Sequence, residues 1–202
     1  IEKFDTIRIK QAALTNKKLF INYKEGFFGF SLKGNDFLCE CSEFDDIIAF
    51  RQDGTYIVTK VGDKKFLGKN IIYAGLWKKN DRHMIYNAVY LNKKDGKSYI
   101  KRFSIESILK DKEYPISKNV EEAKILYITG NPNSESETIK INLHFKSVAK
   151  KKEFEYDFNN IMIKSRLSKG NISSFSFIHS LNKFASGNSS ESKIKNQSDP
   201  FV

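Results

Sequence analysis

Few residues in this sequence have the types and spacing that catalysis requires. Asp45 and Asp46 are adjacent, and paired carboxylates could exchange protons with a substrate or bind Mg²⁺. A solvated turn ahead of a strand explains the same pair, and we favour that interpretation. The sequence contains no glycine-rich phosphate loop followed by a helical pattern and no nucleophile motif. A hydrolase on a β-propeller scaffold is therefore the least favoured hypothesis.

The two cysteines do not point to a reactive site. Cys39 and Cys41 are two positions apart and share a face if they lie in a strand, where neighbouring cysteines rarely satisfy disulfide geometry. A metal site would need more ligands, and the three histidines, His83, His144 and His179, are scattered along the chain. We interpret both cysteines as small buried residues in a reducing, cytoplasmic setting, and we expect no cofactor in this chain.

Cationic side chains give a stronger signal. The formal net charge is +11 and the isoelectric point is near 9.4. This charge fits either a generically lysine-rich surface or a partner that carries phosphates, and we favour the second because the cations gather at turns and strand ends. For any single cluster, a solvated surface explains the charges equally well. The predicted DNA-binding residues are Arg51, Lys60, Lys64, Lys65, Lys69, Lys78, Lys79, Arg82, Lys93, Lys94, Lys97, Lys101, Arg102, Lys164, Arg166 and Lys169.

Duplex DNA is the predicted partner of these cations. If the units that carry them repeat around an axis, the clusters form a curved rim that can follow bent DNA through phosphate contacts alone. No helix that could read a major groove is recognised. Most aromatic residues fall within strand patterns, which argues against a platform that stacks single-stranded bases. The alternative is a protein-interaction propeller whose positive charge is incidental.

The elements that would position these cations are β-hairpins, and the clearest one spans residues 45–60. Asp53 and Gly54 suit the two central positions of a type I′ turn, with apolar and β-branched runs on both sides. The resulting register pairs Arg51 with Tyr56. Both faces of the hairpin are then largely apolar, so we expect it to lie between neighbouring layers.

Further strand patterns follow along most of the chain. Hairpins are predicted at 19–32, 84–105 and 123–145, and single strands at 4–10, 37–41, 71–77, 153–158, 161–164 and 172–178. Residues 106–122 are predicted to be an irregular connection. A succession of glycine, strand and hairpin runs from Gly26, begins again at Gly68, and continues in degenerate form to Gly170. This pattern predicts an all-β, propeller-like array of about four blades of four short strands, with a β-sandwich or two small barrels as the alternative.

The length of 202 residues allows one medium domain or two small ones. We predict one folded domain over residues 1–184 and a disordered polar tail over 185–202, which is rich in Ser, Asn and Lys. The sequence begins at Ile1, which we interpret as the start of an excised fragment. It shows no signal peptide and no apolar run of about 18 residues, so we expect no membrane segment.

Several of these stretches resemble one known family. Residues 24–33 (KEGFFGFSLK), 45–55 (DDIIAFRQDGT) and 99–103 (YIKRF) are similar to the C-terminal domain of the A subunit of bacterial type IIA topoisomerases, and most of all to topoisomerase IV A subunits of the Bacteroidetes type. Residues 69–72, 128–133 and 166–171 fit the same likeness. The individual motifs are short, but their order makes the match fairly specific over residues 1–183.

The resemblance implies a β-pinwheel, a relative of the propeller in which blades exchange strands. It also implies a domain that binds and bends duplex DNA on a basic rim and presents a segment to the DNA gate during relaxation or decatenation. In this family the breakage-reunion Tyr and its Arg partner belong to the N-terminal core of the protein, and ATP and Mg²⁺ are handled by other domains and the B subunit. The chain alone is therefore expected to be inactive. Its expected protein partners are that core and the B subunit.

One motif of the family is largely missing. Gyrase A subunits carry a Gln-Arg-Arg-Gly-Gly-Lys-Gly box that supports chiral wrapping of DNA, and the nearest stretch here, residues 165–171, keeps only Arg166, Lys169 and Gly170. This departure argues against gyrase-type wrapping and favours a decatenating topoisomerase IV.

Overall fold

Sixteen strands and two 3₁₀ helices form the regular structure of the computed structural model, which describes residues 17–118, 120, 122–143, 150–173 and 178–183. Sheet A contains, in spatial order, β3 (Asp36–Cys41), β1 (Lys17–Asn22), β2 (Phe27–Gly29) and β6 (Lys65–Phe66), and sheet B contains β10 (Glu113–Pro115), β5 (Thr55–Lys60), β4 (Asp46–Arg51) and β7 (Ile71–Trp77). Sheet C contains β11 (Ala123–Asn131), β8 (Ile85–Asn92), β9 (Lys97–Ser104) and β14 (Ile163–Lys164), with β15 (Asn171–Ile172) also on β9. Sheet D contains β13 (Glu153–Asp157), β12 (Thr138–Leu143) and β16 (Ile178–Lys183), and the helices are η1 (Pro132–Ser134) and η2 (Phe158–Asn160).

Each repeat of the chain lends a strand to the preceding sheet. Strands β4 and β5 form a hairpin in sheet B, β6 crosses back to the edge of sheet A, and β7 returns to sheet B. The same order recurs with the β8–β9 hairpin, β10 and β11, and again with β12–β13, β14 with β15, and β16. This is the strand exchange of a β-pinwheel, so the predicted all-β fold of about four blades is confirmed.

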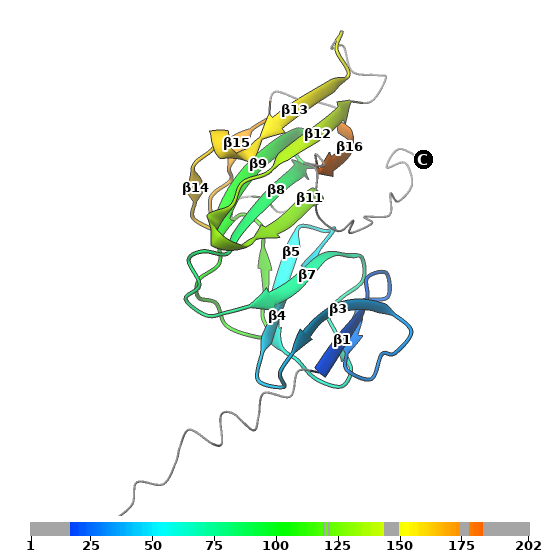
Figure 1. Cartoon of the computed structure of the whole chain (residues 1–202). Helices are drawn as coiled ribbons and strands as arrows, with labels where there is room; N and C mark the ends of the chain where they lie inside the picture. Colours follow the sequence, from blue (N-terminus) through cyan, green and yellow to red (C-terminus); the bar gives the residue numbers. More distant parts are fainter. Residues whose placement is uncertain (1–16, 119, 121, 144–149, 174–177, 184–202) are drawn as a thin grey trace, which may run out of the picture.

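Apolar side chains fill the space between consecutive sheets. One cluster joins sheets A and B around Leu19, Phe28 and Ile47, a second joins B and C around Phe50 and Tyr86, and a third joins C and D. Figure 1 shows the sheets following one another in chain order, from the blue strands of sheet A to the yellow strands of sheet D. Because β4 belongs to two of these clusters, it alternates its side chains between two neighbouring layers.

The hairpin at residues 45–60 exists and is buried on both faces, but the predicted turn is wrong. Tyr56 pairs with Phe50 rather than with Arg51. Gly54 has a φ of +85° and its amide donates to the Arg51 carbonyl, whereas Asp53 is not among the residues with positive φ. These features describe a three-residue loop with glycine at its left-handed position. The one-residue shift moves Tyr56 to the face that sheet C covers.

Two other predictions fail because they assume pairing between strands that are adjacent in sequence. Residues 106–122, predicted to be irregular, contain β10, which pairs with β5 in the preceding sheet. The predicted hairpin at 123–145 does not form, since β11 pairs with β8 and β12 pairs with β13 and β16. Strand exchange accounts for both differences.

The strand predicted at 4–10 and the tail predicted at 185–202 lie outside the described residues. Within the described part of the chain, no helix has the length and apolar character needed to cross a membrane.

Candidate nucleic-acid interface

The hairpin tips of the first three sheets lie against the loops that follow the lent strands. Leu67 and Asn70, after β6, donate backbone hydrogen bonds to Gly26 and Lys24 at the β1–β2 tip. Ile116, after β10, donates to Gly54 at the β4–β5 tip. We call the surface formed by these tips and loops the tip edge, and the opposite ends of the strands the base edge.

Neighbouring parts of the tip edge are also joined to each other. The Gln52 amide donates to the Asn70 carbonyl at 2.9 Å, and the Ile125 amide donates to the Gln52 carbonyl at 2.9 Å. The Lys93 amide donates to the Glu122 carbonyl at 2.8 Å. The tip edge therefore runs without a break from sheet A through sheet B to sheet C.

A lysine lies in each of three loops beside the hairpin tips. Lys69 and Lys118 hold corresponding places, each two residues beyond the residue whose amide donates to the tip glycine. Lys169 lies in the loop between β14 and β15, ahead of the strand that pairs antiparallel with β9. Lys69 and Lys118 are exposed, and the Lys169 side chain is 37% exposed. The repeat of the fold thus produces a repeat of positive charge along one edge.

The loop at 165–171 is the most elaborate part of the tip edge. Lys169 forms an ion pair with Asp95 (Nζ to Oδ2 3.2 Å), its ammonium lies over the Tyr99 ring, and its carbonyl accepts a hydrogen bond from the Tyr90 hydroxyl. Hydrogen bonds with Tyr99 and Asp95 raise the pKa of Lys169. The loop is therefore fixed to the β8–β9 tip with its cation fully charged.

The acidic partner in this contact is held in its charged form. Desolvation alone would raise the pKa of Asp95, but hydrogen bonds from the Lys97 amide, the Tyr99 hydroxyl and the Lys169 ammonium lower it to about 2. Arg166, on the same loop, stacks on the Tyr114 ring and donates to the Tyr56 hydroxyl at 3.3 Å. These contacts join sheets B and C at the tip edge.

The predicted cations divide between the two edges. The tip edge holds Lys69, Lys93, Lys94, Lys97, Arg166 and Lys169. The base edge holds Lys60, Lys64, Lys65, Lys78, Lys79 and Arg82. The two groups flank the eight residues of β8, so they lie about 26 Å apart along this strand. Lys164, half-buried in β14, pairs with Phe103 near the base end of β9 and donates to Asn171.

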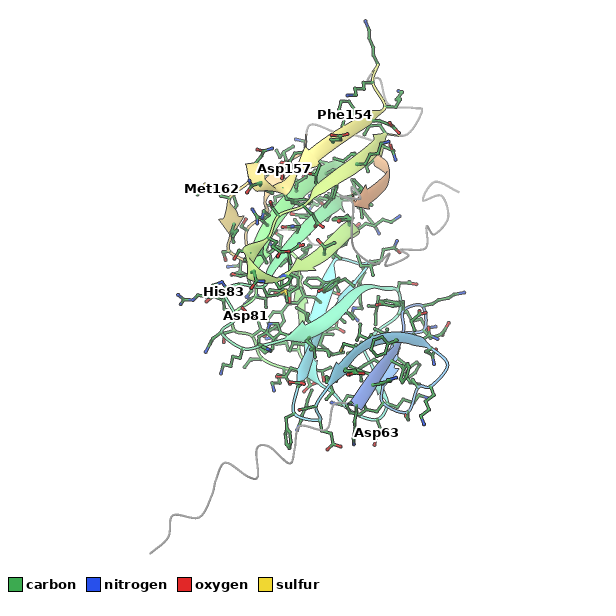
Figure 2. The ribbon with its side chains drawn as sticks, in the orientation of Figure 1. Asp63, Asp81, His83, Phe154, Asp157 and Met162 are labelled. Atoms are coloured by element: carbon green, nitrogen blue, oxygen red, sulfur yellow. The ribbon has the colours of Figure 1, made fainter. Side chains whose placement is uncertain are left out.

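The base edge mixes its cations with acidic residues. Figure 2 places Asp63 at sheet A and Asp81 and His83 where the chain passes from sheet B to sheet C. Arg82 pairs with Glu106 at 3.1 Å. Within the described ranges, Lys69, Lys93, Lys97 and Lys118 of the tip edge form no ion pair, and neither do Lys60, Lys64, Lys78 and Lys79 of the base edge. What distinguishes the tip edge is that backbone hydrogen bonds join it from sheet A to sheet C.

Arg51 is not a rim residue. It is 8% exposed, and its guanidinium donates to Thr55 Oγ1 at 2.8 Å and pairs with Glu113 Oε2 at 2.9 Å. A Cβ at Gly68 would lie 2.3 Å from Arg51 Nη1, so the packing of this guanidinium requires a glycine at position 68. Arg51 holds the lent strand β10 against the β4–β5 tip, so its predicted exposure is wrong.

Lys101 is also a structural residue. It is 1% exposed, and its ammonium donates to the carbonyls of Ile116 and Arg166, both at 2.6 Å, while lying over the Phe103 ring. Burial, together with the nearby charge of Arg166, lowers the pKa of Lys101 to about 7. Two backbone segments that follow lent strands are therefore joined by one amine.

Arg102 serves the same purpose on the other face of β9. It is 5% exposed and donates to the carbonyls of Ser134 and Glu135, at 3.1 and 3.2 Å, and to Phe158 at 3.5 Å. These carbonyls belong to the connection between sheets C and D and to η2. Lys101 and Arg102 thus point away from the surface, and their predicted exposure is wrong as well.

The sequence does contain a signal for these buried cations. Arg51, Lys101 and Arg102 interrupt strands whose other residues are apolar, and strands covered on both faces bury every position. Three exposed or half-exposed cations of the tip edge were missed instead: Lys24, Lys118 and Lys124. Burial lowers the pKa of Lys124, and the nearby charge of Lys93 lowers it further.

The described residues contain no group of three or more His, Cys, Asp or Glu side chains placed to bind a metal ion. Both cysteines are free, and Cys41 is buried, which raises the pKa of its thiol to about 12. Asp45 caps a turn by accepting from the Ser42 amide, and Asp46 pairs with Lys110. The carboxylates that suggested acid/base chemistry therefore have local structural partners.

Comparison with known families decides the classification. The family described as the topoisomerase C-terminal domain of Bacteroidota matches residues 18–185. The chain belongs to this family. It is also 34% identical over 107 residues to the A subunit of DNA topoisomerase 4 from Borreliella burgdorferi, a match that covers 52% of this chain and 17% of that protein.

A solved structure shows the same fold as this topoisomerase C-terminal domain. The crystal structure of the C-terminal domain of DNA topoisomerase IV superposes with a TM-score of 0.59 at 13% identity, covering 84% of this chain and 61% of that one. The chain therefore spans less than two thirds of each relative. The predicted family and fold are confirmed by these matches.

Proposed function

We propose that this topoisomerase C-terminal domain binds duplex DNA along the tip edge. The observation that supports it most directly is a hydrogen-bonded edge from sheet A to sheet C that carries Lys69 and Lys118 in corresponding loops and Lys169 in the loop between β14 and β15. A row of cations suits the repeated phosphates of a duplex, and backbone contacts of this kind carry no sequence preference.

Within a whole enzyme, this binding would serve to bend DNA and present a segment to the gate. We infer that the domain contributes no catalytic group, that cleavage belongs to the N-terminal core of the same polypeptide, and that ATP and Mg²⁺ act on other domains and the B subunit. Because the loop at 165–171 lacks most of the gyrase box, relaxation and decatenation fit better than gyrase-type supercoiling.

A matched pair of variants tests the proposed surface. The first replaces Lys69, Lys93, Lys97 and Lys118 of the tip edge with Gln; the second replaces Lys60, Lys64, Lys78 and Lys79 of the base edge. All eight are exposed, so both variants lose the same charge without disturbing the core. Affinity for a 30-base-pair duplex is measured by gel shift and anisotropy as a function of salt.

We expect the tip-edge variant to lose affinity and to reduce the slope of log K against log salt by about 0.9 for each phosphate that it no longer neutralises. The base-edge variant should keep most of the slope. Equal effects of both variants would show that charge, rather than this edge, attracts DNA. No duplex binding by the unmodified chain at low salt would overturn the proposal and favour the protein-interaction alternative.

A further inference from the structure

The outward face of sheet A displays four phenylalanine side chains. Ile21 and Phe28 pair across β1 and β2 and point into the core between sheets A and B. The alternate positions must therefore point away from sheet B. These positions carry Phe20, which pairs with Phe37 on β3, and Phe27, which pairs with Phe66 on β6.

The rings meet as two cross-strand pairs. The centroids of Phe20 and Phe37 are 6.2 Å apart at an angle of 73°, and those of Phe27 and Phe66 are 5.1 Å apart at 49°. One ring of each pair is well exposed, since Phe37 and Phe66 each keep 56% of their surface accessible. The aromatic surface therefore extends across all four strands of the sheet, a span of about 14 Å at the usual strand spacing.

Within the described residues, the apolar cluster that joins sheet A to sheet B lies on the other face of sheet A. Single exposed apolar residues need no explanation, but four aromatic rings on one sheet face mark a binding surface. Polar groups frame it: the Lys64 ammonium lies 5.0 Å from the Phe27 centroid, and Lys18 stands opposite Glu40 at the other end of β1.

We propose that the outward face of sheet A binds the unpaired bases of single-stranded nucleic acid. Phe37 and Phe66 would stack on two bases, with Phe20 and Phe27 supporting their rings, and Lys64 would pair with a phosphate between them. Every base has a π-face, so exposed rings beside a cation form a platform that tolerates any sequence. The sequence argued against such a platform because these phenylalanines lie in strands; among the described residues, they lie on the side of sheet A that faces away from the core.

The position of Lys64 favours nucleic acid over an apolar protein partner. A protein that covered the Phe27 ring would have to desolvate the ammonium above it, whereas a phosphate would pair with that charge. The net charge of +11 also favours a polyanion. This site is distinct from the proposed duplex surface, because the bases of a duplex are already stacked on each other.

The test compares three single substitutions in the 202-residue chain: Phe37→Ala, Phe66→Ala and, as a control, Phe44→Ala. Phe44 is 66% exposed and also lies under a lysine ammonium, that of Lys60 at 5.1 Å, but it is in the turn before β4. Binding of fluorescein-labelled dT12 is followed by anisotropy at low salt, and a 30-base-pair duplex is measured in parallel. Melting temperatures check that each variant is folded.

We expect the unmodified chain and Phe44→Ala to bind dT12 alike, and Phe37→Ala and Phe66→Ala to bind it about tenfold more weakly each. Duplex affinity should change by less than twofold. Absent dT12 binding, or equal weakening in all three variants, would overturn the proposal and leave the duplex surface untouched. If the two variants instead abolish a dimer detected by sedimentation, the face is an interface between copies and the proposal is wrong.

Discussion

Lys101 shows how a cation can stabilise the interior of this fold. Its amine donates to two loop carbonyls, one after β10 and one after β14. A neutral amine has two N–H groups, which match these two acceptors, and neutrality avoids the cost of burying a charge. The lowered pKa of Lys101, about 7, is consistent with this use.

The stability of the domain should therefore depend on pH through Lys101. Its pKa falls from 10.5 in the unfolded chain to about 7 in the folded one, so between pH 7 and 10 the unfolded chain binds more protons at this site. The free energy of unfolding then rises with pH in this window by up to about 1.4 kcal/mol per unit, and the contribution is constant below pH 7.

Urea denaturation of the unmodified chain and of Lys101→Met between pH 6 and 9 isolates this effect, because tyrosines and other groups titrate alike in both. We expect Lys101→Met to become less stable relative to the unmodified chain as the pH rises above 7. A stability difference that stays flat across this range would show that Lys101 keeps its proton in the folded state.

Gly54 and Gly96 have similar backbone conformations but different surroundings. Both have positive φ, +85° and +65°, but a Cβ at Gly54 would lie 2.4 Å from the Ala123 Cβ, whereas nothing lies within 4 Å of one at Gly96. Gly96→Ala should cost about 1 kcal/mol for the left-handed backbone. Gly54→Ala should cost about 1–3 kcal/mol more from overpacking, as measured by urea denaturation. Equal costs would contradict the close approach of β11 to this tip.

At the scale of the element, apolar patterns predicted most strands well, while their registers and partners depended on contacts elsewhere. Strand β7 has the predicted bounds, and the hairpins at the β1–β2 and β8–β9 tips formed as expected. The β4–β5 loop departs from the type I′ prediction because Gln52 exchanges backbone hydrogen bonds with Asn70 and Ile125, which belong to β6–β7 and β11. Local turn chemistry cannot reveal such distant partners.

The short lent strand β10 should depend on Arg51. Among the described strands, its three residues pair with β5 alone. The Arg51 side chain, which is 10% exposed, adds an ion pair to Glu113. Arg51→Lys cannot reach Thr55 and Glu113 together, because the ammonium lacks the guanidinium fork. We expect faster amide hydrogen exchange in β10 and a loss of about 1–3 kcal/mol in stability.

Arg82→Lys provides the control for this substitution. The Arg82 side chain, which pairs with Glu106, is 79% exposed, so the change should alter stability by less than about 0.5 kcal/mol. Unchanged exchange rates in β10 of Arg51→Lys would mean that the backbone ladder alone holds this strand.

At the scale of the whole molecule, the sequence predicted the fold class and the number of blades because each blade contains one hairpin with a recognisable tip. It could not predict the lent strands from periodicity, because β6, β14 and β15 have only two residues each and β10 has three. For the same reason, the sequence did not show which cations lie on each edge and which lie in the interior. Arg82 precedes β8 and Lys93 follows it, so the direction of this strand places the two cations on opposite edges.

Strand exchange also predicts how the domain should respond to truncation. A chain that ends at residue 137 loses sheet D, but it also loses β14 and β15, which cover the edge of β9 in sheet C. It further loses the Arg166 carbonyl to which Lys101 donates and the Phe158 carbonyl to which Arg102 donates. Sheet C should therefore lose stability although β8, β9 and β11 all remain.

Hydrogen exchange on the chain ending at residue 137 measures this coupling. We expect amides in sheet C to exchange at least tenfold faster than in the full chain, while sheet A keeps its protection. A peptide of residues 158–173, which contains both lent strands, should restore part of the protection of β9 when added in trans. A truncated chain with unchanged exchange in β9 would mean that each sheet is stable without the strand lent by the next repeat.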